Sequence, residues 1–136
     1  VFTAISAGQP VYHTNVMMSL AETYAVVCME SIPDAAERRQ LADSLERTGK
    51  ELVEISASQM TDFAGNMLQV RSVNGEPYCV MSERAYQSLN ADQVMRLEAH
   101  NKLLFSSLET IETFGGGSAR CMIAENFLPL QTAGLN

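Results

Sequence analysis

Runs of apolar residues in the first half of the chain predict two strands, a helix and a third strand. Residues 16–20 and 24–29 are apolar, β-branched or aromatic runs on either side of a short polar turn, which is typical of two buried strands. Ser31-Ile32-Pro33-Asp34 supplies a capping residue, an early proline and an acid, so it predicts the start of a helix that ends at Gly49. Residues 50–55 alternate in polarity and predict the third strand.

The second half of the chain repeats this order of elements. Residues 67–73 and 77–81 resemble strands, and Asn74-Gly75 between them is a strong hairpin signal. Two helical pieces follow, the first at residues 82–89 and the second beginning with a capping box at Asn90. The pattern assigns Val94, Leu97 and Leu104 to the apolar face of the second piece and residues 108–111 to a further strand.

Sliding the chain over itself by 51 positions aligns the two halves and suggests the start of a third copy. The aligned sets are Asn15 and Asn66, Cys28 and Cys79, Ser31 and Ser82, and the triplet Tyr12, Phe63 and Phe114. We therefore predict one α/β domain built from strand-strand-helix-strand modules, at residues 11–61 and 62–112, with a closing module that begins at 113–136.

Modules of this size bury their apolar faces against neighbouring modules, and fewer than about three rarely suffice. We expect the chain to be the C-terminal part of a longer array whose N-terminal modules are its natural partners. Strand edges left open by those modules are expected to pair with another copy of the chain, giving a homo-oligomer.

Charge and composition exclude several classes of protein. Sixteen acidic and nine basic residues give a net charge of −7, which repels nucleic acids and anionic membrane surfaces. The sequence has neither an apolar run of about 18 residues nor the features of a signal peptide at its start, so we expect a cytoplasmic location. Three widely spaced cysteines and two histidines indicate neither a disulfide framework nor a metal site, and we expect no cofactor.

Gly115-Gly116-Gly117 followed by Cys121 is the stretch with the clearest potential for chemistry. Three glycines allow a sharp backbone turn, but no Lys-Ser or Lys-Thr follows as a phosphate-binding loop requires. By itself Cys121 is as compatible with a small buried residue as with a nucleophile. His13 and Cys121 lie near equivalent places of the first and third modules, so modules around an axis would bring them together as a Cys and His pair.

The remaining histidine, cysteines and methionines favour structural roles. His100 falls on a polar helix face and is expected to be solvated. Cys28 and Cys79 lie in apolar runs, as structural core cysteines do, and the methionines are typical core residues.

Three stretches resemble the C-terminal half of arginine-deiminase-related hydrolases of the citrulline-utilisation type, in the guanidino-group-modifying amidinotransferase, or pentein, superfamily. The resemblance covers residues 10–129. The stretches are Tyr12-His13-Thr14-Asn15-Val16-Met17-Met18, Asp62-Phe63-Ala64-Gly65-Asn66-Met67-Leu68, and Thr110-Ile111-Glu112 leading into Gly115-Gly116-Gly117-Ser118-Ala119-Arg120-Cys121-Met122.

The resemblance implies a pentein fold, a five-bladed α/β propeller around a central site, of which this chain would be a part. It implies Cys121 as the nucleophile and His13 as the general acid and base. Asn15, Asn66 and Ser118 would line the substrate pocket. Several relatives carry Asp at the position of Asn15, and a neutral amide there is compatible with a ureido group.

Three hypotheses about function follow. The first is a cysteine-dependent hydrolase of guanidino or ureido C–N bonds that works through an S-linked intermediate, present here as an inactive C-terminal fragment. The second is a Cys-His amide or peptide hydrolase with an oxyanion hole at Gly116 and Gly117. The third is a non-catalytic fragment that self-associates through its strand edges.

Overall fold

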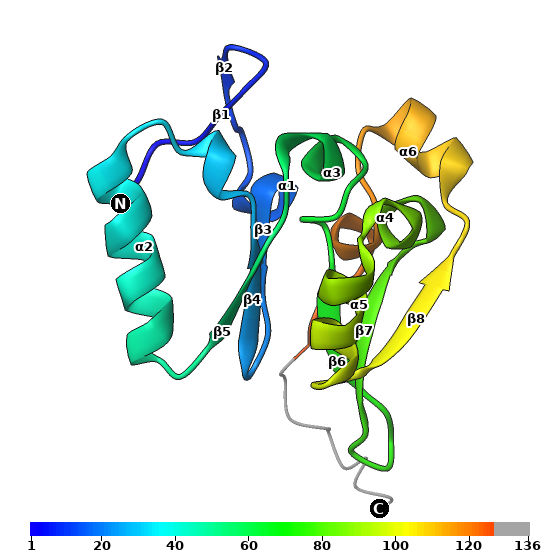
Figure 1. Cartoon of the computed structure of the whole chain (residues 1–136). Helices are drawn as coiled ribbons and strands as arrows, with labels where there is room; N and C mark the ends of the chain where they lie inside the picture. Colours follow the sequence, from blue (N-terminus) through cyan, green and yellow to red (C-terminus); the bar gives the residue numbers. More distant parts are fainter. Residues whose placement is uncertain (127–136) are drawn as a thin grey trace, which may run out of the picture.

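Two three-stranded sheets of identical strand order form the framework of the chain, whose computed structural model describes residues 1–126 (Figure 1). In each sheet the first strand is antiparallel to the central strand and the third strand is parallel to it. The third strands of the two sheets begin at Glu51 and Lys102, which are 51 positions apart, as are the aligned cysteines. The first sheet consists of β3 (Met18–Leu20), β4 (Tyr24–Val27) and β5 (Glu51–Glu54), and the second of β6 (Leu68–Arg71), β7 (Pro77–Ser82) and β8 (Lys102–Ser106).

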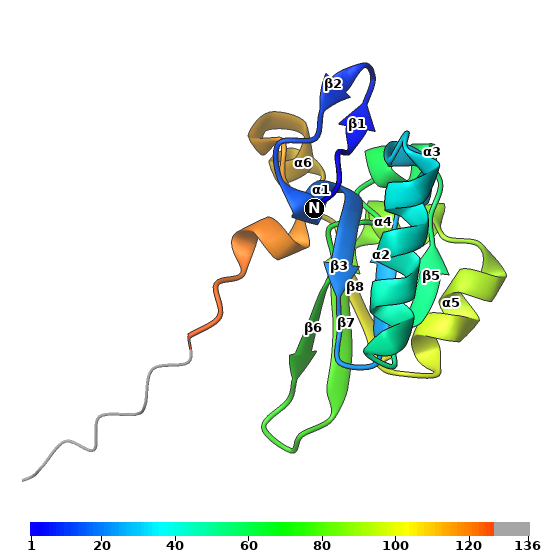
Figure 2. The same cartoon turned by 90° about the vertical axis from the view of Figure 1, so that its left-hand side faces the viewer.

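Helices flank both sheets, and a small hairpin precedes them. In Figures 1 and 2, α2 lies along the first sheet, and α5 contacts both β5 and β8 and so joins the two sheets. The hairpin is β1 (Ile5–Ser6) with β2 (Gln9–Pro10), and the helices are α1 (Thr14–Met17), η1 (Met29–Ser31), α2 (Ala35–Arg47), α3 (Ala57–Thr61), α4 (Glu83–Ser88), α5 (Ala91–Glu98), α6 (Glu109–Gly115) and η2 (Ala119–Met122). Within residues 1–126, none of these helices has the length and apolar character that crossing a bilayer requires.

Helix ends follow the local signals in the sequence. Asp34, and not Ser31 as expected, caps α2: its side chain accepts the amides of Ala36 and Glu37, and these hydrogen bonds lower the pKa of the Asp34 carboxyl. Beyond α2, Gly49 adopts a φ of 72°, a left-handed conformation that suits glycine. The predicted capping box at Asn90 is confirmed at the start of α5.

The prediction for the segment after α5 is wrong in two places. The helix ends at Glu98, and Lys102–Ser106 forms β8, so Leu104 lies on an edge strand and is 53% exposed. Residues 108–111 were expected to be a strand but belong to the loop before α6 and to its start. The strand β8 forms because it pairs in parallel with β7, a contact that no local pattern shows.

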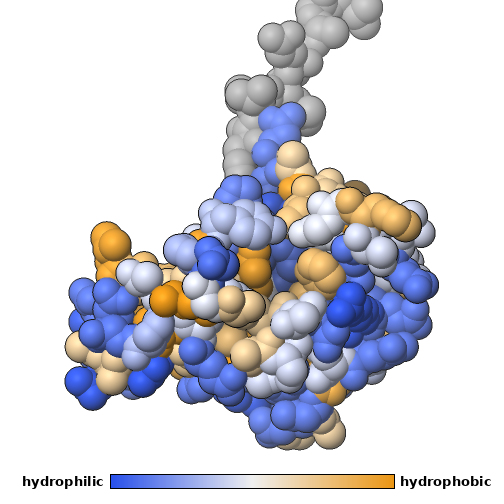
Figure 3. Space-filling model, turned by 90° about the horizontal axis from the view of Figure 1, so that it is seen from above, coloured by the Kyte–Doolittle hydropathy of each residue, from blue (hydrophilic) through white to orange (hydrophobic). Residues whose placement is uncertain are grey.

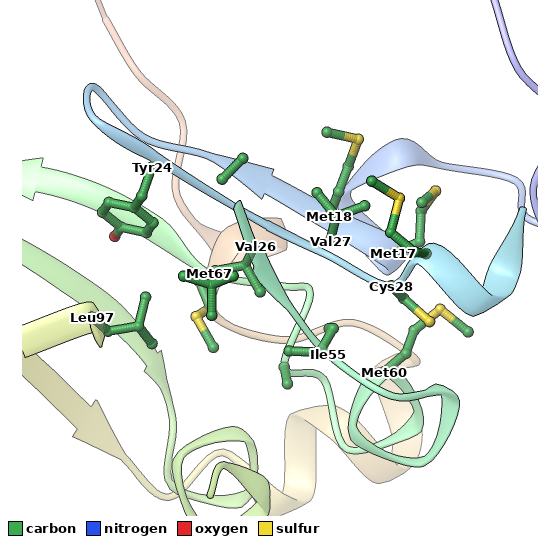
Figure 4. Close-up of a cluster of buried hydrophobic side chains, with 14 of the residues drawn as sticks. Met17, Met18, Tyr24, Val26, Val27, Cys28, Ile55, Met60, Met67 and Leu97 are labelled. Atoms are coloured by element: carbon green, nitrogen blue, oxygen red, sulfur yellow. The ribbon is translucent and has the colours of Figure 1, made fainter. Parts of the chain in front are cut away.

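The core lies between the sheets and is rich in sulfur. Figure 4 shows Met67 and Leu97 of the second half packed near Tyr24 and Val26 of the first. The prediction that Cys28, Cys79 and the methionines fill the core is confirmed for residues that are almost inaccessible, namely Met17, Met18, Cys28, Met67, Cys79 and Met81. Burial raises the pKa of the Cys79 thiol to about 11, so this thiol is protonated at neutral pH.

His100 connects the two sheets instead of being solvated, so the prediction for this residue is wrong. Its Nε2 donates to Glu51 Oε2 at 2.8 Å, its Nδ1 shares a hydrogen bond of 2.9 Å with Thr23 Oγ1, and its ring stacks on Tyr24 at a centroid distance of 5.2 Å. The position after α5 turns the imidazole toward the first sheet, which a helical pattern alone does not show.

Glu51 also accepts from Arg96 Nε at 2.5 Å. The hydrogen bonds from His100 and Arg96 lower the pKa of the Glu51 carboxyl. A carboxyl with a depressed pKa stabilises the fold above its unfolded pKa, and this contribution is lost as the pH falls through the folded pKa.

We predict that Glu51→Gln lowers the free energy of unfolding at pH 6–7 by about 0.5–1 kcal/mol, as partly exposed ion pairs do. The difference from the unsubstituted protein should shrink as the pH falls through the lowered pKa of Glu51, where this carboxyl becomes protonated. Urea unfolding at a series of pH values measures this. Glu98→Gln, an exposed change on α5, the helix that carries Arg96, is the control, and a difference that does not shrink in acid contradicts the assignment.

Candidate active site

Cys121 lies in η2 on an exposed part of the surface, beside a cavity of about 210 Å³. In the glycine loop before it, the backbone comes close to the thiol. A Cβ added at Gly117 would lie only 3.2 Å from Cys121 Sγ. Gly116 has a φ of 65°, a conformation that L side chains rarely adopt. The cavity is lined by Ser6, Tyr12, Val16, Met60, Thr61, Phe63, Asn66, Gly116, Gly117 and Cys121.

Asn66 holds the cysteine segment from the side of the second module. Its side chain is buried, and Nδ2 donates to Cys121 Sγ at 3.2 Å. Its Oδ1 accepts the backbone amides of Arg120 at 3.0 Å and Cys121 at 3.4 Å. An N–H group donated to sulfur favours negative charge on that sulfur, which is the state a nucleophilic thiol requires.

Asn15 approaches the same sulfur from α1. Its Nδ2 lies 3.7 Å from Cys121 Sγ, and its backbone carbonyl accepts from Asn66 Nδ2 at 2.9 Å. Within residues 1–126 its buried Oδ1 has no hydrogen-bond partner. Asn15 therefore carries a buried acceptor without a partner, and it does not line the cavity beside Cys121, where it was expected.

Gly65 allows α1 and the Asn66 segment to meet. A Cβ at Gly65 would lie 2.5 Å from Val16 O and 2.9 Å from the carbonyl carbon of Met17, which is too close for any side chain. The close backbone approach at Gly65 therefore sets the distance between Asn15 and Asn66.

His13 is exposed and precedes α1 in an extended conformation. Its ring centroid lies 5.0 Å from that of Tyr12, whose hydroxyl donates to Gly116 O at 3.5 Å. Within the described part of the chain the imidazole has no hydrogen bond and does not line the cavity beside Cys121. Tyr12 and Asn15, which flank His13 in the chain, nevertheless both contact the segment that carries Cys121. The fold therefore brings the two distant motifs together.

Ser118 was expected to line the cavity beside Cys121, but it does not. Its side chain is fully buried, and its hydroxyl donates to Glu112 Oε1 at 2.6 Å. The sequence reasoning missed Tyr12 and Glu112 as members of this region. Both lie within the motifs quoted above, but only their contacts in the fold reveal them.

Other cavities lie elsewhere in the described part of the molecule. One of them, about 420 Å³, lies between η1, α2 and β5 and is lined by no cysteine or histidine. A second, about 400 Å³, lies between β3 and β6 on the side of Asn15 and Arg120. Among residues 1–126 no cluster of three or more His, Cys, Asp or Glu side chains could hold a metal ion.

A comparison with known protein families shows where the chain belongs. The family model described as N,N dimethylarginine dimethylhydrolase, eukaryotic, matches residues 1–128. The chain belongs to this family. The resemblance to the pentein superfamily, inferred from the three motifs, is thereby confirmed.

Solved structures support the fold of this dimethylarginine dimethylhydrolase family member. One similar structure is that of apo ArgZ, an arginine dihydrolase from the ornithine-ammonia cycle in cyanobacteria, with a TM-score of 0.61 and 20% identity. The match covers 87% of this chain and 17% of the ArgZ chain, so the chain spans less than a fifth of that protein. No curated protein sequence matches significantly. The predicted α/β fold is confirmed, while the described residues contain two three-stranded sheets, the small β1–β2 hairpin and no closed propeller.

We predict that Gly65→Ala lowers the free energy of unfolding by about 3 kcal/mol, because the new methyl group would collide with backbone atoms of α1. Gly115→Ala is the matched control, since its Cβ would meet only Ile111 Cγ2 at 3.7 Å and should change stability by less than about 1 kcal/mol. Chemical unfolding measures both. Equal stabilities for the two variants would show that the backbone is not close at Gly65.

We predict that Asn66→Asp slows alkylation of Cys121 about tenfold, because it removes an N–H donor from sulfur and introduces a carboxylate there. Iodoacetamide labelling followed by peptide mass spectrometry gives the rate at Cys121. Asn74→Asp in the exposed β6–β7 turn makes the same chemical change away from the thiol. Rates for Asn66→Asp within twofold of the unsubstituted protein contradict the assignment.

Proposed function

We propose that the chain carries the nucleophile of a hydrolase that cleaves C–N bonds of guanidino or ureido compounds. Cys121 is the nucleophile in this proposal, and His13 is the general acid and base. The observation that carries it is the exposed Cys121 sulfur beside a cavity, with the Asn66 amide donating to it at 3.2 Å. Membership of a family described as dimethylarginine dimethylhydrolases supports the choice of substrate group.

The carbon of a guanidino or ureido group is a poor electrophile, because its π electrons are shared with three heteroatoms. A thiolate attacks such a carbon better than water does. Attack by Cys121 Sγ forms an S–C bond and a tetrahedral adduct. The C–N bond then breaks, and the departing nitrogen takes a proton from the His13 imidazolium. Water next attacks the S-linked carbon, His13 accepts its proton, and the thiolate leaves.

The position of His13 is consistent with this role. Tyr12 and Asn15, on either side of it, already contact Gly116 and Cys121. Catalytic hydrogen bonds are often long in an unliganded site and shorten when substrate binds. The free imidazole can therefore turn toward the cavity without breaking an existing hydrogen bond.

Recognition of the substrate requires groups in addition to those described. The ten residues around the cavity beside Cys121 include no carboxylate, whereas a guanidinium is normally bound by paired carboxylates. We propose that further modules of the same protein, arranged as a propeller, supply these acids, and that the 136-residue chain is inactive alone. Asn15 Oδ1, which is buried and has no partner among residues 1–126, would accept an N–H of the substrate after a turn of its side chain toward the cavity.

The amide hydrolase hypothesis receives less support, because the family that matches is described by the hydrolysis of dimethylarginine. An oxyanion hole near the nucleophile requires free backbone N–H groups. The amides of Arg120 and Cys121 both donate to Asn66 Oδ1, so an oxyanion hole would depend on Gly116 and Gly117.

We predict that Cys121→Ser in the native full-length protein abolishes release of ammonia or alkylamine from arginine, methylated arginine and citrulline. The loss should exceed about 10³-fold, because a hydroxyl is a far weaker nucleophile at neutral pH. His13→Ala should lower turnover about 10²–10⁴-fold, as expected for a general acid and base. Amine release and the intact mass of acid-quenched enzyme measure turnover and the S-linked intermediate.

Cys79→Ala, which removes a buried thiol, is the control and should retain the covalent adduct. Full turnover by Cys121→Ser would exclude the proposed nucleophile. Turnover of peptides or simple amides but of no guanidino or ureido compound would favour the amide hydrolase. Stable dimers without any turnover would favour a non-catalytic role.

A further inference from the structure

The buried pair of Glu112 and Ser118 spans the glycine loop behind Cys121. Glu112 lies in α6 before the three glycines, and Ser118 follows them directly. The Ser118 hydroxyl donates to Glu112 Oε1 at 2.6 Å, within the range of strong O–H···O bonds to carboxylates. Glu112 is 5% exposed and Ser118 is fully buried, so water does not compete for this bond. The hydrogen bond therefore connects the two ends of the glycine loop on its buried side.

The same loop continues into the cysteine. The backbone amide of Cys121 donates to Ser118 O at 3.0 Å, and a Cβ added at Gly117 would lie 3.1 Å from Cys121 Cβ. A change in the position of Ser118 must therefore move Cys121. On the other side, Asn66 holds the Arg120 and Cys121 amides. The nucleophile segment is thus held at two points, one at Ser118 and one at Asn66.

The helix itself does not require a carboxylate at position 112. The Glu112 amide already makes a regular helical bond to Leu108 O, and Oε2 has no partner among the described residues. A buried carboxyl with an unpaired oxygen costs free energy, and an apolar side chain would fill the space without that cost. The presence of this carboxylate is explained if Oε1, which accepts from Ser118, has a function outside the helix.

We propose that Glu112 is a positioning residue for Cys121, acting through the Ser118 hydroxyl. Glu112 does not touch the thiol, and its effect depends on the hydrogen bond across the glycine loop. The inference rests on the proposed role of Cys121 as the reactive group. It adds a residue that neither the family description nor the cavity beside Cys121 identifies.

The test uses the rate of alkylation of Cys121 by iodoacetamide in the native protein, which needs no substrate. Failure to find a hydrolase activity would therefore leave this test intact. Glu112→Ala and Ser118→Ala should each slow the reaction about tenfold, because displacement of Ser118 moves the thiol away from the Asn66 donor. The double variant should be no slower than either single variant, since both break the same bond.

Conservative and matched variants separate positioning from general destabilisation. Glu112→Gln keeps an oxygen that accepts from Ser118 and should restore the rate to within about threefold. Glu109→Gln removes a carboxylate from the exposed side of the same helix and should leave the rate unchanged. Labelling of the buried Cys79 in the same samples reports unfolding. If Glu112→Ala exposes Cys79, the decision falls to Ser118→Ala and Glu112→Gln.

Three results would overturn the proposal. The first is a Cys121 rate within twofold of the unsubstituted protein in Ser118→Ala and Glu112→Ala. The second is additive slowing in the double variant, which would mean that the two residues act independently. The third is a Glu112→Gln variant as slow as Glu112→Ala, because the charge and not the hydrogen bond would then be responsible.

Discussion

The side-chain amide of Asn66 joins three segments that are distant in the chain. Its nitrogen donates to the carbonyl of Asn15 and to the Cys121 sulfur, and its oxygen accepts two backbone amides of η2. The side chain is buried, so these bonds do not compete with water. The arrangement of the candidate site depends on this one residue, because the three segments follow strands of three different sheets, β2, β5 and β8.

The repeated framework explains how such a residue comes to lie at the centre. Asn15 and Asn66 are 51 positions apart and precede the first strands of the two sheets, which run in the same order. The close approach at Gly65 brings the second of these segments against the first. In the predicted repeat the glycine loop before Cys121 is the third equivalent segment. On that prediction the site is built from corresponding places in successive modules, as in proteins whose repeats surround a shared pocket.

Buried polar residues surround the segment that carries Cys121. The core between the sheets is apolar and rich in methionine, whereas Asn66, Glu112 and Ser118 are buried polar residues grouped around the cysteine segment. Buried polar networks cost desolvation and are tolerated where their hydrogen bonds fix one geometry. Cys28 and Cys79 lie in the apolar part, where burial raises the thiol pKa, and only Cys121 is exposed. Environment alone thus distinguishes the three cysteines.

The sequence by itself determined the elements whose signals are local. Asp34 and Asn90 mark helix starts, Asn74-Gly75 marks a hairpin, and the alignment of Cys28 with Cys79 reveals the repeat. These features depend on backbone propensities and capping bonds within a few residues. The three motifs also indicated the family, although they could not show how their side chains meet.

Only the tertiary structure decided the interactions that local residue patterns do not show. The strand β8 forms by pairing with β7, and His100 turns inward to Glu51, although its sequence neighbours predict a solvated helix face. Ser118 faces Glu112 and not the cavity because the glycine loop reverses the chain between them. Each of these outcomes depends on contacts between residues that are far apart or on the conformation of glycines, and residue patterns do not encode either one.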